Sequence, residues 1–176
     1  MDIQIRKETP EDYDQVHTII QAAFKHEPHS DHTEHLLVDR LRKSGAFIPE
    51  LSLVAECNGK VVGHILLTKI KINNDDASFE SLALAPISVV PIEQGKGIGG
   101  KLINEAHSVA KNLGYSSVIL LGHEAYYPKF GYQTASSFGI TLPFEVPDEN
   151  VMAIELSARA LDNVSGTVEY AKEFFE

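Results

Sequence analysis

The stretch QGKGIGG, which begins at Gln94, places four glycines in seven positions, a pattern suited to holding a phosphate. Glycines let a phosphate approach the backbone closely, and the first turn of a helix directs free N–H groups and a partial positive charge at an anion. Gly95, Gly97 and Gly100 fit the dinucleotide pattern G-x-G-x-x-G, whereas Gln94, Gly97 and Gly99 fit Q-x-x-G-x-G. The stretch therefore predicts an anion site and leaves two kinds of cofactor open.

A strand and a helix must position these glycines. Residues 79–90 form an apolar run with few charges, which predicts a strand covered on both faces, and Pro86 predicts a bulge because proline cannot donate a ladder hydrogen bond. Apolar residues then recur at helical spacing over 97–113, and Lys111 and Gly114 are typical of a helix end. The glycines thus lie in the loop and first turn between a central strand and a helix.

The context of the glycines weakens the dinucleotide interpretation. That fingerprint follows a strand directly within a βαβ unit and has an acidic residue about 20 positions later. Here the residues PIEQ, 91–94, intervene and a hairpin-rich half precedes them, although Glu124 could serve as the acid. A nicotinamide-dependent oxidoreductase stays an alternative, as does a purely packing role for the glycines. Packing alone accounts poorly for four glycines with Lys96 among them.

The rest of the chain predicts a mixed α/β fold without a low-complexity linker or repeat. Thr9 and Pro10 are typical of a helix start, and Asn58-Gly59 between two β-rich runs favours a tight hairpin turn. Val168 and Tyr170 could add one more pairing. The other predicted elements are a strand at 3–5, a helix from 9 to about 25, a helix that Ser30 or Asp31 caps and that ends before Gly45, strands 51–57 and 60–72, a strand 117–121, a short helix 124–130 closed by Gly131, and a strand 151–156.

Composition limits the functional class. With 176 residues, of which 43% are hydrophobic, we expect one domain over residues 1–176. A formal charge of -10 and the absence of any Lys/Arg run argue against nucleic acid as a partner. Cys57 is the only cysteine, so no intramolecular disulfide can form, and no segment approaches the roughly 20 apolar residues of a membrane span. We therefore expect a cytoplasmic protein.

Two segments together resemble the GNAT superfamily of acyl-CoA-dependent N-acetyltransferases. LALAPISVVPIEQGKGIGGKLI, 82–103, is similar to its motif A, whose signature Q/R-x-x-G-x-G/A matches Gln94, Gly97 and Gly99. AYYPKFGY, 125–132, is similar to its short helix with an aromatic-glycine-aromatic turn, and details around Pro86 resemble a small bacterial subgroup of acetyltransferases. The resemblance implies an α/β (α+β) GNAT fold with a mixed central sheet splayed at its fourth and fifth strands, helices on both faces, and acetyl-CoA as the cofactor.

The resemblance also implies functional residues. It places the tyrosine four positions before Gly131, Tyr127, as the general acid that protonates the leaving thiolate, with Tyr126 expected in the core. A bulge near Pro86 would splay strand 79–90 from strand 117–121 and free the backbone N–H groups around Val89 and Val90 for the pantetheine arm. The residues implied to bind the cofactor are Ser88, Val89, Val90, Gln94, Gly95, Lys96, Gly97, Ile98, Gly99, Gly100 and Lys101.

Acetyl transfer to an amine also requires that the amine lose a proton. An alkyl amine with a pKa of about 10.4 is neutral only about once per thousand molecules near pH 7.4. His123 and Glu124 follow the predicted strand 117–121 and are candidate bases, but they could equally cap the short helix; Glu80 is a weaker candidate. Many relatives carry an asparagine where this chain has Leu120, so the acceptor side departs from the family pattern.

The remaining predictions concern the histidines and the molecules that the protein binds. The segment HEPHSDHTEH, 26–35, spreads four histidines over half a helix surface, so we expect no metal site there. We expect His17, His64 and His107 at surface or half-buried positions. The acceptor is expected to be a small-molecule or protein amine and the protein a monomer or homodimer. A CoA-binding sensor without turnover is the second alternative.

Overall fold

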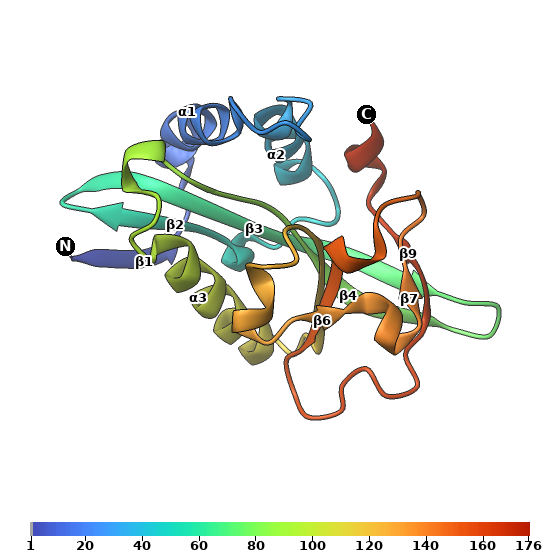
Figure 1. Cartoon of the computed structure of the whole chain (residues 1–176). Coiled ribbons are helices and arrows are strands. Elements are labelled where there is room, and N and C mark those ends of the chain that lie inside the picture. The colour runs from blue at the N-terminus through green and yellow to red at the C-terminus, as the bar shows by residue number, and fades with distance from the viewer. Residues whose placement is uncertain (1) are drawn as a thin grey trace.

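A central mixed sheet carries the fold in the computed structural model, which describes residues 2–176 (Figure 1). The main path of the sheet runs β1-β2-β3-β4-β5-β8-β6, while β9 pairs with β3 and β7 pairs with β9. Only the β4–β5 and β7–β9 pairs are parallel. The strands are β1 Ile3–Lys7, β2 Ser52–Cys57, β3 Lys60–Asn73, β4 Ser78–Val89, β5 Ser117–Leu121, β6 Gln133–Thr134, β7 Ile140–Thr141, β8 Val151–Glu155 and β9 Gly166–Glu169.

Helices cover both faces of this sheet. α1 and α2 lie on one face and α3 lies on the other, while the C-terminal end of the chain lies beside α2 (Figure 1). Among residues 2–176, no helix is long and apolar enough to cross a membrane. The helices are α1 Tyr13–Phe24, α2 Glu34–Arg42 and α3 Ile98–Asn112, with 3₁₀ helices η1 Pro10–Asp12, η2 Pro49–Leu51, η3 Pro91–Glu93, η4 Tyr127–Phe130, η5 Ala135–Phe138, η6 Asp148–Asn150 and η7 Lys172–Phe175.

Strand β3 shows why the sheet is apolar on both sides. Successive side chains of a strand point to opposite faces, so Leu66 and Leu67 belong to different cores. Leu67 packs in the cluster that contains α3, and Leu66 packs in the cluster that contains α1 and α2. Both leucines are fully buried. A long strand without alternation is therefore the expected sequence signature of this position.

Most predicted elements are present, and the differences are local. The hairpin turns at Asn58 and Gly59, which both have positive φ. Val168 adds a further pairing as predicted, with Ile72 as its partner, whereas Tyr170 lies beyond the end of β9. The second helix begins at Glu34, later than predicted, because the Asp31 carboxylate accepts the Thr33 N–H and forms a turn before the helix. The predicted helix 124–130 is only the 3₁₀ helix η4. The two-residue strands β6 and β7 were not predicted.

Candidate active site

The sheet opens between β4 and β5. These strands pair at only two positions, Leu82 with Val118 and Ala83 with Ile119, and β4 then continues to Val89 without β5 as a partner. The register with β3 shifts between the Leu67–Leu84 and Ile65–Ile87 pairs, so β4 has one extra residue there. The predicted bulge at Pro86 and the splay between the fourth and fifth strands are therefore confirmed.

Some backbone N–H groups at the end of β4 bind β3, and others point toward the gap between β4 and β5. Val90 donates its N–H to Val62 O at 2.9 Å, so this group is not free, contrary to our expectation. Ladder hydrogen bonds alternate along antiparallel strands, so Val89, which pairs with Gly63, directs its N–H away from β3 and toward the gap. The Val89 carbonyl accepts a hydrogen bond from Gln94 Nε2 at 2.9 Å. The gap therefore offers the N–H of Val89 to a ligand.

The glycines of the motif have two different structural roles. Gly95 and Gly97 have φ values of 79° and 84°, in the left-handed region that favours glycine. Gly97 directly precedes α3 as its N-cap. Gly99 and Gly100 instead allow close approach, because an added Cβ would lie 2.9 Å from the Tyr126 hydroxyl and 3.2 Å from the Phe130 ring respectively. The packing alternative is therefore correct for part of the motif.

A cavity of about 500 Å³ lies at the start of α3. Most of the residues that the sequence predicts to bind the cofactor line this cavity. Four further residues also line it: Glu93, Tyr126, Lys129 and Phe130. The predicted residues outside its lining are Ser88, Val90, Lys96 and Lys101. Its lining residues are Val89, Glu93, Gln94, Gly95, Gly97, Ile98, Gly99, Gly100, Tyr126, Lys129 and Phe130.

The charges of this cavity suit an anion. The N-terminus of α3 contributes roughly half a positive charge, and its first N–H groups have no partner within the helix. Lys96 is bound to Glu93 at 3.0 Å, which compensates its charge. Lys129 makes no ion pair within residues 2–176, and its ammonium group lies 4.1 Å from the centre of the Tyr126 ring. Lys129 is therefore the cation at this cavity that is available to a ligand.

The positions of the Tyr126 and Tyr127 side chains differ from the expected ones. Tyr127 is the more buried of the two, with 9% exposure, and packs in the core beside Tyr132 and against Gly122, where an added Cβ would collide with its ring. Burial raises the pKa of Tyr127 to about 12. Tyr126, expected in the core, lines the cavity instead. Because Tyr127 keeps its proton at physiological pH, its hydroxyl group can donate that proton there but cannot act as a phenolate base.

The two predicted bases lie at the end of β5. Both His123 and Glu124 are exposed, and neither belongs to the lining of the cavity at α3. The His123 carbonyl accepts the Tyr126 N–H at 3.1 Å, and the Glu124 carboxylate accepts a hydrogen bond from Asn150 Nδ2 at 2.8 Å. Asn150 also donates to Gly122 O, so this contact joins the end of β5 to the start of β8. These contacts order the segment after the strand.

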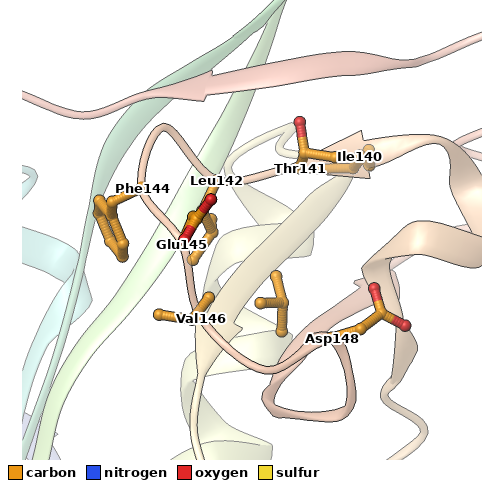
Figure 2. Close-up of a pocket in the computed structure, with 8 residues that line it drawn as sticks. Ile140, Thr141, Leu142, Phe144, Glu145, Val146 and Asp148 are labelled. Carbon is orange, nitrogen blue, oxygen red and sulfur yellow. The ribbon is translucent and has the colours of Figure 1, made fainter.

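A second cavity, of about 530 Å³, lies on the opposite face of the sheet (Figure 2). Ile140, Leu142 and Val151 belong to a cluster that includes Ala83 and Ile119, the pair at which β4 and β5 separate. The neighbouring residues of that pair, Leu82 and Val118, pack on the α3 side. The lining residues are Ile140, Thr141, Leu142, Phe144, Glu145, Val146, Asp148 and Val151.

The histidines of segment 26–35 form local contacts. His32 Nδ1 lies 2.9 Å from Phe24 O, and His35 Nε2 lies 3.4 Å from the Gln21 amide. Within residues 2–176, no group of three or more His, Cys, Asp or Glu side chains could hold a metal ion. His107 is half-buried as expected, lies 2.8 Å from the Tyr132 hydroxyl, and has a pKa that burial lowers to about 4.

His64 is fully buried, so the surface or half-buried position that we expected for it is wrong. Its position in β3 faces α1 and α2, and Nε2 lies 3.0 Å from the Ser52 hydroxyl. Its neighbours in sequence, Val61, Val62, Ile65 and Leu66, are all apolar. A histidine within a strand that reads as apolar on both faces has no route to solvent, and this was the signal for its burial.

The comparisons with known proteins agree with this architecture. The acetyltransferase (GNAT) domain family matches residues 4–135. The chain is 28% identical to the uncharacterized N-acetyltransferase YhbS of Escherichia coli over 171 residues, 97% of each chain. It is 37% identical to the uncharacterized N-acetyltransferase YjhQ of Escherichia coli over 115 residues, 65% of this chain and 64% of that relative. The chain therefore belongs to the GNAT family, and it is an acyltransferase.

Solved structures show the same fold. The crystal structure of YhbS from Escherichia coli, determined in complex with CoA, has a TM-score of 0.88 at 26% identity and covers 99% of this chain and 92% of that one. A GNAT family acetyltransferase from Brucella melitensis, in complex with acetyl-CoA, has a TM-score of 0.81 at 33% identity over 98% of both chains. These similarities confirm the predicted mixed α/β GNAT fold.

Proposed function

We propose that the protein transfers an acetyl group from acetyl-CoA directly to a primary amine of a small molecule. The observation that carries this proposal is the pair of cavities on opposite faces of the sheet, with the opening between β4 and β5 between them. The cavity at α3 suits the phosphates, the gap beside Val89 suits the pantetheine arm, and the second cavity suits the acceptor. The relatives determined with CoA and acetyl-CoA support the choice of cofactor over a nicotinamide dinucleotide.

The second cavity favours an acceptor with an apolar body and a further cationic group. Ile140, Leu142, Val146 and Val151 form an apolar part of the lining that an alkyl or aryl stem would cover, and the carboxylates of Glu145 and Asp148 lie in the same cavity. Asp148 accepts a hydrogen bond from Ser136, whereas Glu145 makes no side-chain hydrogen bond or ion pair within residues 2–176. An alkyl or aryl diamine would bury its stem and place its second ammonium group near Glu145.

The reaction makes two demands on this chain beyond binding. The carbonyl oxygen of the thioester needs a donor as it gains negative charge, and the N–H of Val89 at the opened edge of β4 can provide it. The leaving thiolate needs a proton, and we assign this role to Tyr127. With a pKa of about 12 against about 8.5 for a thiol, this transfer is uphill by roughly 5 kcal/mol, a cost that a transient step can bear.

An amine panel tests the proposed reaction. Acetyl-CoA is mixed with the protein and with monoamines, diamines, an aminoglycoside and a lysine peptide, and release of the free thiol is followed. We expect release with the alkyl or aryl diamines. Stabilisation by acetyl-CoA without thiol release for any amine would instead favour a CoA-binding sensor, and stabilisation by NAD alone would favour the oxidoreductase.

Glu145→Gln should discriminate between amines in this panel. Removing the carboxylate should raise KM for a diamine about tenfold, close to the loss of one charge-assisted hydrogen bond, and should leave the monoamine of equal length nearly unchanged. The exposed Glu149, which lines neither cavity, provides the matched control Glu149→Gln. Equal effects on both amines, or none on either, would show that Glu145 does not contact the acceptor.

Lys129→Ala should weaken binding of CoA about tenfold or more, because Lys129 is the unpaired cation that lines the cavity at α3. The loss should shrink at high salt, since screening reduces the interaction that the variant lacks. Isothermal titration calorimetry at two salt concentrations measures both effects. Lys111→Ala, in the last turn of the same helix, is the control and should bind CoA normally. An unchanged affinity for Lys129→Ala would exclude a phosphate contact.

A further inference from the structure

The second cavity has an aromatic side chain at one end and acidic side chains further along it. Figure 2 shows Phe144 at one end and Asp148 at the other, with Glu145 between them. Phe144 is 42% exposed although its side chain is large and apolar. Ligand sites are typically lined by such aromatic side chains together with a few polar groups. The acceptor described so far makes no use of this ring.

The Tyr170 ring supports one face of the Phe144 ring. The two ring planes lie at 15° to each other, with 6.1 Å between the ring centres. This separation and angle are in the range of a stacked aromatic pair. A ring that stacks on one neighbour is covered on one face only, which agrees with the exposure of Phe144. The other face of the Phe144 ring is therefore available to a ligand in the cavity.

Tyr170 is itself held by contacts on two sides. It follows β9 and packs against the apolar cluster behind the second cavity. Its ring centre lies 4.8 Å from that of Phe174, which packs against the cluster of α1 and α2, and Arg40 Nε donates to the Glu173 carbonyl at 3.0 Å. Burial raises the pKa of Tyr170 to about 12, so the ring is uncharged at physiological pH. The C-terminal segment thus connects α2 to the wall of the cavity.

Two prolines restrict the loop that carries Phe144 and Glu145. Pro143 and Pro147 flank the three residues 144–146, and each proline fixes its own φ near -65°. A loop that is already restricted loses little conformational freedom when a ligand binds, so less of the binding energy is lost. The aromatic ring and the neighbouring carboxylate are therefore presented together on one short loop.

The Val151 side of the cavity borders the opening between β4 and β5. Val151 pairs with Leu121, which lies beyond Ile119, the last residue of β5 that pairs with β4. An acceptor whose ring lies on Phe144 can therefore extend its reactive amine past Val151 toward the opening. The acetyl group would be transferred there.

We propose that the acceptor is an aryl diamine, whose ring stacks on the free face of Phe144 and whose second ammonium group binds Glu145, with Tyr170 as the residue that positions Phe144. The inference rests on the proposed transfer to an amine and names the acceptor class of that site. Stacking of two aromatic rings adds about two- to tenfold in affinity beyond the area that it buries. A saturated ring of similar size buries a similar area and lacks this contribution.

Two diamines of the same skeleton test this assignment. The acceptors are para-xylylenediamine and its saturated analogue, trans-bis(aminomethyl)cyclohexane, and kcat/KM is measured for both. Phe144→Leu keeps an apolar side chain but removes the aromatic face, so it should lower the ratio of the aryl to the saturated diamine about two- to tenfold. The change should appear in KM. The two ammonium groups differ in pKa, but this difference is the same in every variant and cancels.

Phe79→Leu is the matched control, because Phe79 packs against the same cluster but lies outside the lining of the cavity. Its ratio should equal that of the wild type. Tyr170→Leu should lower the ratio, and Tyr170→Phe should retain it, because the ring alone supports Phe144. A merely structural role of Tyr170 would change both diamines equally.

The wild type alone provides a second measurement if Phe144→Leu folds poorly. The two diamines with fully methylated nitrogens cannot be acetylated and have no proton to lose, and the aryl form should be the stronger competitive inhibitor. Equal inhibition by the two forms, or a wild-type ratio in Phe144→Leu, would overturn the aromatic contact. A wild type that acetylates only alkyl amines would also overturn it, whereas one that acetylates no amine of the panel would refute the proposed function itself.

Discussion

Tyr127→Phe should lower kcat by roughly 10²- to 10⁴-fold, the usual contribution of a general acid, while binding of acetyl-CoA stays intact. The phenylalanine ring preserves the packing against Tyr132 and Gly122, so the folded state should be retained. Burial raises the pKa of Tyr127 to about 12, so the wild-type rate should not fall from loss of this proton at any pH below about 10. Thiol release in single turnovers measures the chemical step directly.

Tyr126→Phe is the internal control for this result. Its hydroxyl lies at the cavity near Gly99, so its removal should change the affinity for CoA and leave kcat almost unaffected. The opposite pattern, a large loss of kcat in Tyr126→Phe and none in Tyr127→Phe, would transfer the acid role to Tyr126. Normal single-turnover rates in both variants would mean that another group protonates the thiolate.

Gly97→Val should abolish stabilisation by CoA in a chain that still folds. Gly97 is the N-cap of α3 with φ of 84°, and a β-branched residue there is strained whatever the available space. Relief of that strain would turn the first N–H groups of the helix away from the phosphates. Thermal unfolding with and without CoA gives the result.

Gly59→Val is the matched control for the backbone strain that Gly97→Val introduces. Gly59 has φ of 77° in the β2–β3 turn and, like Gly97, has no atom within 4 Å of an added Cβ. Both variants should therefore lose a similar amount of stability, about 1–2 kcal/mol, from backbone strain alone. Only Gly97→Val should lose the shift in melting temperature on adding CoA. A normal shift in Gly97→Val would exclude a role of this turn in phosphate binding.

Hydrophobic periodicity and turn-forming residues predicted the elements that are long or that depend on residues close together in the sequence. Helix α3 and the β2–β3 hairpin follow from residues near one another in the chain, so tertiary contacts only confirm them. The strands β6 and β7 have two residues each, too few for any periodicity, and their pairing with β8 and β9 depends on the assembled sheet. Helix α2 shows a related limit, because the side chain of Asp31 competes for the backbone that it was expected to cap.

The candidate site was predictable where it is contiguous in sequence. The glycines and Gln94 lie in one loop, so the motif identifies them together. Lys129 and Tyr126 reach the same cavity from a segment about 30 residues away, and no spacing in the sequence records that approach. The exchange of positions between Tyr126 and Tyr127 depends on Gly122, which provides space for the Tyr127 ring. The polar contacts among Glu8, Arg42, Ser52 and His64 join four separate segments that only the fold brings together.

The opening between β4 and β5 has a thermodynamic consequence. Because β5 does not pair with the end of β4, the Val89 N–H has no acceptor on a neighbouring strand. A ligand in the gap would provide that acceptor. A compound that binds only the folded chain stabilises it by about 2.7 kcal/mol at a hundred times its Kd. The folded population of this protein would then depend on the concentration of its own acetyl donor, so the supply of that metabolite would influence abundance as well as rate.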